Sequence, residues 1–88
     1  PSMEDLRQRI KDTLTSELML EVTADEIGDE TPLFGPDGVG LDSVDALQLV
    51  VALEKHFGLK IQDQDKAREI LKNVATIAQA IEANNASA

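Results

Sequence analysis

The chain has 88 residues, which is enough for one small domain with a single hydrophobic core. Seventeen acidic residues against eight basic ones give a formal net charge of −9, which argues against nucleic-acid partners and against anionic membrane surfaces. There is no cysteine, so disulfides and thiolate metal sites are excluded, and two Phe without Tyr or Trp predict an aliphatic core.

The first ten residues contain no apolar run, so we expect no secretory signal. No stretch approaches the roughly 20 apolar residues of a membrane helix, so we expect a cytoplasmic protein without membrane insertion. Residues 1–88 are expected to form one domain, ordered from about residue 3 to 83, with a frayed tail over 84–88. The acidity either serves solubility alone or favours docking to basic protein patches.

The first predicted element is an amphipathic helix. Ser2 stands before an acidic first turn, which is typical of a helix N-cap. Apolar residues then recur every four positions and form one stripe, at Leu6, Ile10, Leu14 and Leu18. We expect this helix to end near Leu20.

Residues 21–42 are predicted to form a long loop. The segment Thr23–Glu26 can cap one short turn, and six helix breakers follow, at Gly28, Pro32, Gly35, Pro36, Gly38 and Gly40. Loops of this length are often functional. The apolar residues expected to fold back onto the core are Ile27, Leu33, Phe34 and Val39.

A second helix is predicted from Ser43 to Phe57, with Asp42 at the N-cap, Asp45 at the third position and Gly58 as its stop. The helical period assigns five residues to an inward face: Ala46, Leu49, Val50, Leu53 and Phe57. It assigns four to an outward stripe: Val44, Gln48, Val51 and Lys55. The two valines of this stripe are either part of a partner surface or ordinary scattered surface residues.

After a connector with Leu59 and Ile61, Asp63 or Asp65 can begin a short third helix that includes Ala67, Ile70 and Leu71. A capping box over Thr76–Gln79 predicts the start of the last helix, with Ile77, Ala80 and Ile81 inward. The predicted fold class is therefore all-α: a small four-helix bundle with a long loop between helices 1 and 2 and a short third helix.

Ser43 is the most conspicuous candidate for chemistry, but the sequence offers it no catalytic partner. A nucleophilic serine needs a nearby base, and His56 lies on the same predicted helix, roughly 20 Å along its axis. We therefore expect no catalytic residues, and His56 to be an ordinary surface residue. A calcium loop beginning at Asp63 lacks the required Gly and Glu, because Arg68 and Val74 stand there, so no metal site is expected. Taken alone, Ser43 is a helix cap or a surface hydroxyl.

The segment Gly40–Asp45, the apolar run Leu49–Glu54 and the pair Phe57–Gly58 resemble the acyl carrier protein family. The resemblance continues through Ile61, Asp63 and the Thr76–Ile77 pair and covers nearly the whole chain. It implies that Ser43 receives 4'-phosphopantetheine from coenzyme A through a phosphopantetheinyl transferase. The protein would then carry acyl groups as thioesters on this arm, without being an enzyme.

The resemblance also implies partners: acyl-transferring, condensing and tailoring enzymes with basic docking patches. The residues expected to meet them are Asp42, Val44, Asp45, Gln48 and Val51. A second set either lines an acyl pocket or packs as plain core: Leu49, Leu53, Ile61 and Ile70. A monomer is expected.

Gln48 and Lys55 stand where many family members have acids, and the Gly35–Val39 segment is extended. These departures leave two pathways open, fatty-acid synthesis and a specialised, polyketide-like acyl pathway. An unmodified acidic helical domain that docks a basic partner is the main alternative. A small hydrolase using Ser43 lacks the necessary base.

Overall fold

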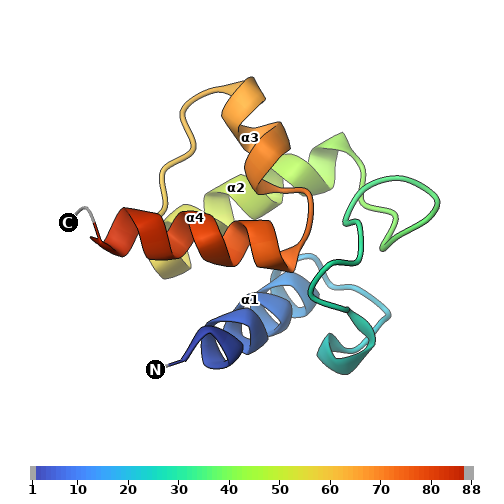
Figure 1. The fold of residues 1–88 in the computed structure, drawn as a ribbon. Coiled ribbons are helices and arrows are strands. Elements are labelled where there is room, and N and C mark those ends of the chain that lie inside the picture. The colour runs from blue at the N-terminus through green and yellow to red at the C-terminus, as the bar shows by residue number, and fades with distance from the viewer. Residues whose placement is uncertain (1, 87–88) are drawn as a thin grey trace.

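The computed structural model describes residues 2–86. Within them the chain forms four α-helices and one short 3-10 helix: α1 (Met3–Glu17), η1 (Ala24–Glu26), α2 (Ser43–Phe57), α3 (Gln64–Ile70) and α4 (Val74–Ala86) (Figure 1). Strand-like pairing in this part of the chain is limited to an isolated bridge between Phe34 and Leu41. The predicted all-α fold class is confirmed.

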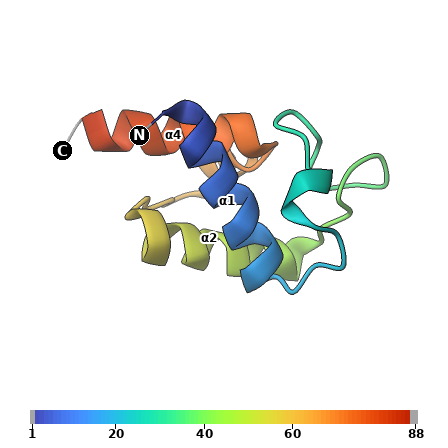
Figure 2. The same ribbon diagram turned by 90° about the horizontal axis from the view of Figure 1, so that it is seen from below.

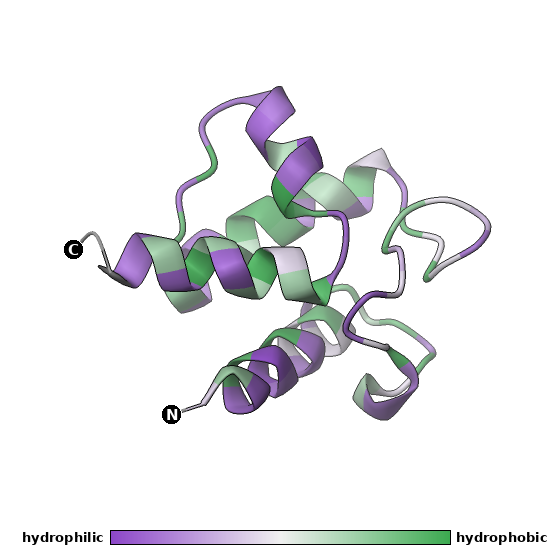
Figure 3. Ribbon diagram, in the orientation of Figure 1, coloured by the Kyte–Doolittle hydropathy of each residue, from purple (hydrophilic) through white to green (hydrophobic). Residues whose placement is uncertain are grey.

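The helices pack around α1, which contacts α4, α2 and η1, while α3 packs against α4. Seen from below, α1 crosses both α2 and α4, and the long loop lies at the end away from the chain termini (Figure 2). Figure 3 shows hydrophilic residues on the outer side of α1 and along α3. None of the helices in residues 2–86 has the length and apolar character needed to cross a membrane.

The core is aliphatic, as predicted. Its best buried side chains come from three helices and from the loop: Ile10, Leu14, Leu49, Leu53, Ile77, Ile81, Ile27, Leu33 and Val74. Leu6 and Leu18 complete the predicted stripe of α1 as partly buried residues packed on this core. Phe34 and Val39 are also partly buried there, which confirms that the long loop folds back.

Helix α1 begins as predicted and ends three residues early. Ser2 Oγ accepts from the Asp5 backbone N–H at 3.2 Å, and the Asp5 carboxylate accepts from the Ser2 backbone N–H at 3.4 Å. The helix ends at Glu17, because Met19 adopts a left-handed backbone with φ 51° that breaks the helical ladder. Leu20 N then donates to Thr15 O at 3.1 Å and closes the last turn.

The start of α4 corrects the predicted capping box. The helix begins at Val74, where Asn73 Oδ1 accepts from Thr76 N at 2.8 Å and Thr76 Oγ1 accepts from Asn73 N at 3.1 Å. Thr76 is therefore the third helical residue and not the cap. Helix α4 continues through Ala86, while residues 87 and 88 of the expected frayed tail lie outside the described residues.

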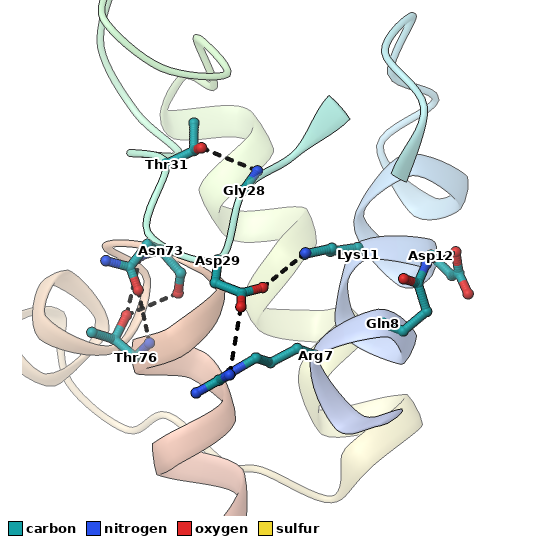
Figure 4. A network of polar contacts seen from close by, with 9 residues as sticks. All are labelled: Arg7, Gln8, Lys11, Asp12, Gly28, Asp29, Thr31, Asn73 and Thr76. Carbon is teal, nitrogen blue, oxygen red and sulfur yellow. Dashed lines mark hydrogen bonds and ion pairs between the residues drawn. The ribbon is translucent and has the colours of Figure 1, made fainter. Parts of the chain in front are cut away.

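The long loop is held to the bundle by polar contacts around Asp29 (Figure 4). The Asp29 carboxylate pairs with Lys11 Nζ at 2.8 Å and with Arg7 Nη1 at 3.5 Å, both on α1. The Asp29 carbonyl accepts from Ala75 N at 2.9 Å, at the start of α4. Within the loop, Gly28 N donates to Thr31 Oγ1 at 3.1 Å. These contacts fix the base of the loop that leads to Ser43.

Candidate functional site

Ser43 is the first residue of α2, and the structure separates it from the capping role. Asp42 Oδ1 accepts from Asp45 N at 2.9 Å, and Asp45 Oδ2 accepts from Asp42 N at 3.0 Å, which forms the predicted capping box. Ser43 is exposed, and within residues 2–86 its hydroxyl makes no hydrogen bond. Because the Asp42 carboxylate caps the helix, the Ser43 hydroxyl is not needed for that role.

The backbone before Ser43 is held by a short ladder of hydrogen bonds. Leu33 N donates to Lys72 O at 3.0 Å, and Leu41 N donates to Leu33 O at 2.9 Å. Leu41 is 5% exposed, so the residue two positions before Ser43 is anchored in the core. Gly40 turns the chain into the helix with φ +85°, a conformation that favours glycine. Ser43 therefore stands on a fixed support.

An open cavity of about 460 Å³ lies beside Ser43. Its walls come from the loop, α2, α3 and the α3–α4 connection: Phe34, Leu41, Asp42, Ser43, Ala46, Ala67, Arg68, Leu71 and Lys72. The wall is mostly apolar, and its charged side chains are Asp42, Arg68 and Lys72. Such a cavity can shelter a slender chain attached to the serine.

The four residues predicted to line an acyl pocket do not line this cavity. Leu49 and Leu53 are 1% and 0% exposed and lie inside the core. Ile61 lines a separate hollow of about 240 Å³ near Val50, and Ile70 is partly buried against the core. A role for these four residues in holding an acyl chain stays a prediction.

The outward stripe of α2 is more apolar than predicted. Val44 and Val51 are 63% and 57% exposed, and Leu47, which the sequence analysis did not assign, is 66% exposed. The spacing of 44, 47 and 51 places these three residues on one helix face, and that spacing is the signal that could have identified Leu47. We call Val44, Leu47, Gln48 and Val51 the α2 outer face; Gln48 is exposed as well.

His56 lies at the opposite end of α2 and is tied to α1. Its Nε2 lies 2.5 Å from Glu17 Oε1, and this hydrogen bond is the main cause that lowers the pKa of Glu17 below its ordinary value. His56 follows Ser43 by 13 positions on the same helix, which is roughly 20 Å at 1.5 Å per residue. His56 therefore cannot activate Ser43. Among the described residues, no group of three or more His, Asp or Glu is placed to hold a metal ion.

The fold and the site define a small helical domain that presents an exposed serine beside a mostly apolar cavity. A protein-family model described as a phosphopantetheine attachment site matches residues 8–81. The chain belongs to this family, so it is a carrier protein to which 4'-phosphopantetheine is attached covalently. It works with a phosphopantetheinyl transferase and with enzymes that handle acyl groups.

The residues present fit this group. A phosphodiester link needs a free hydroxyl, and the Ser43 hydroxyl is exposed and unbonded within the described part of the chain. The walls of the cavity provide apolar surface on which the methyl and methylene groups of the arm can pack. The arm supplies a terminal thiol that carries acyl groups as thioesters.

Proposed function

We propose that Ser43 is the residue that bears the 4'-phosphopantetheine and that the protein presents acyl intermediates to enzymes of fatty-acid or specialised, polyketide-like biosynthesis. The observation that carries this proposal is the free Ser43 hydroxyl, placed at the first turn of α2 beside an apolar cavity. The cytoplasmic location and monomeric state expected from the sequence stay predictions.

Attachment needs only a hydroxyl from this chain. Ser43 Oγ forms a bond to the phosphorus of coenzyme A that bears the pantetheine, and the bond from that phosphorus to the adenosine bisphosphate breaks. The serine proton needs a base, and His56 lies too far along α2 to accept it. We expect the transferase to supply the base, which agrees with a carrier that does not catalyse its own modification.

The surface beside Ser43 supports docking by partner enzymes. Asp42 and Asp45 place two carboxylates next to the attachment point, and such charges mainly raise the association rate and orient a basic partner. The α2 outer face adds exposed apolar side chains directly behind them. Gln48 and Lys55 make this helix less acidic, which favours partners that rely on apolar contact with Val44, Leu47 and Val51.

The test is modification of the apo protein by a broad-specificity phosphopantetheinyl transferase with coenzyme A, followed by intact mass measurement. The wild type should gain one phosphopantetheine, and Ser43→Ala should gain none. The matched control is Ser16→Ala, which changes an exposed serine on a different helix, α1, and this variant should be modified normally. If several transferases leave the wild type unchanged, the domain acts as an unmodified acidic docking module.

A further inference from the structure

Two basic residues, Arg68 and Lys72, lie on the wall of the cavity that contains Ser43. Arg68 is in the last turn of α3, Lys72 follows that helix, and both are exposed. Three cations of α1 have partners: Arg7 and Lys11 pair with Asp29, and Arg9 stacks over the Phe57 ring at 4.9 Å. Within residues 2–86 neither Arg68 nor Lys72 forms an ion pair.

Backbone hydrogen bonds connect Lys72 to the segment before Ser43, and both residues line the same cavity. The Lys72 carbonyl accepts from Leu33 N at 3.0 Å, and the Leu33 carbonyl accepts from Leu41 N at 2.9 Å, two residues before Ser43. On the other side, Leu71 is 4% exposed and continues the apolar wall. The backbone of Lys72 and the segment that leads to Ser43 are therefore joined by hydrogen bonds.

The negative charges beside Ser43 give these two cations a possible role. A phosphodiester on Ser43 adds a negative charge next to the carboxylates of Asp42 and Asp45, in a chain whose net charge is already −9. Like charges at such short range repel. Arg68 and Lys72 are the cations that share the cavity with Ser43, and guanidinium and ammonium groups are the usual partners of phosphate oxygens.

We propose that Arg68 and Lys72 bind the phosphodiester of the attached arm and so hold the pantetheine against the apolar wall of the cavity. This inference rests on the proposed attachment at Ser43. Exposed ion pairs are weak and screened by salt, so the arm docks reversibly and remains available to partner enzymes. The two residues act as positioning residues for the arm and take no part in its chemistry.

The experiment compares ¹H–¹⁵N spectra of the apo and modified protein, together with the ³¹P signal of the phosphodiester. Attachment in the wild type should shift the amide signals of three cavity residues: Ala46, Ala67 and Leu71. In the double variant Arg68→Gln/Lys72→Gln, the ratio of docked to free arm should fall roughly three- to tenfold, as expected for losing two exposed ion pairs. The cavity shifts should shrink and the ³¹P signal should move toward that of a free phosphodiester.

Two control variants separate this effect from net charge and from folding. Lys60→Gln/Lys66→Gln removes the same charge from exposed residues outside the cavity and should behave as the wild type. The exchange Arg68→Lys/Lys72→Arg keeps both cations and should retain most of the cavity shifts. Thermal unfolding of each variant confirms that the fold is intact.

Intact mass distinguishes the two ways in which the idea can fail. If the protein takes up no phosphopantetheine, the proposed function is wrong and this inference falls with it. If the mass shows one attached group but the Arg68/Lys72 double variant matches the Lys60/Lys66 control, the inference is wrong and the proposed function stands. Equal cavity shifts in low and high salt for the wild type would also contradict it.

Discussion

Gly38 supports the loop before Ser43, and its replacement by alanine is a direct test of that support. A Cβ at this position would lie 1.8 Å from Pro32 O, which is backbone and cannot move aside easily. The same carbonyl accepts from Val39 N at 2.9 Å, so relieving the clash strains or breaks this hydrogen bond. The lost hydrogen bond costs about 1 kcal/mol, and the residual backbone strain adds about 1–2 kcal/mol.

We therefore expect Gly38→Ala to destabilise the protein by about 2–3 kcal/mol, from those two contributions. Urea unfolding measures the free energy, and the rate of modification by a phosphopantetheinyl transferase measures the placement of Ser43. Gly58→Ala is the control, because Gly58 has φ +68° and lies at the far end of α2. It should cost about 1–2 kcal/mol, because alanine is strained in this left-handed conformation, and it should leave modification unchanged. Wild-type stability for Gly38→Ala, or modification as fast as in Gly58→Ala, would refute this reasoning.

Three further changes test other parts of the molecule. Asp42→Asn should keep the cap, because Asn caps as well as Asp, but it should slow modification and flatten its salt dependence; unchanged kinetics would contradict a steering role. Leu53→Ala removes a side chain that is 0% exposed and should cost about 2–5 kcal/mol in urea unfolding. The hydrogen bond from His56 lowers the pKa of Glu17 in the folded state below its ordinary value of 4.5. The ionised Glu17 therefore stabilises the fold at pH values above 4.5, and this stabilisation is lost as the pH falls through the lowered pKa. Glu17→Gln should therefore weaken the acid sensitivity of unfolding, and an unchanged pH profile would count against the Glu17–His56 contact.

Helix α2 was predictable from sequence because its signals are local. Asp42 and Asp45 form the capping box three positions apart, and Gly58 adopts the left-handed conformation that ends a helix, with φ 68°. Neither signal depends on distant parts of the chain. The exposure of Val44 and Val51 followed from the helical period, but Leu47 was missed because it lies at the edge of the outward face, beside the stripe that was assigned.

The start of α4 needed tertiary information. Thr76 can begin a capping box or complete one, and both patterns satisfy local rules. The structure selects the earlier start, because Val74 is 0% exposed and Ala75 N donates to Asp29 O in the long loop. The burial of Val74 and the hydrogen bond of Ala75 both depend on segments far away in the chain, so the local sequence pattern could not choose between the two starts.

The cavity beside Ser43 could not be predicted from the sequence, for the same reason. Its wall joins Phe34 of the loop, Ala46 of α2 and Leu71 after α3, and only the folded chain shows that these residues meet. From the family resemblance we expected the inward residues Leu49 and Leu53 of α2 either to line a pocket or to pack as plain core, and helical periodicity cannot distinguish these two roles. In the structure Leu49 and Leu53 are closed off in the core.

Asp42 connects the two roles of the first turn of α2. A helix start leaves backbone N–H groups that a nearby oxygen must accept, and a serine at this position could be used for that purpose. Here the Asp42 carboxylate accepts the Asp45 N–H, so the next residue, Ser43, keeps its hydroxyl unbonded. The cost is a negative charge beside the future phosphodiester. Arg68 and Lys72, which line the same cavity, are placed to offset that charge without competing for the cap. If Ser43 bears the arm as proposed, the acid that caps the helix and the bases that bind the phosphodiester are complementary parts of one attachment site.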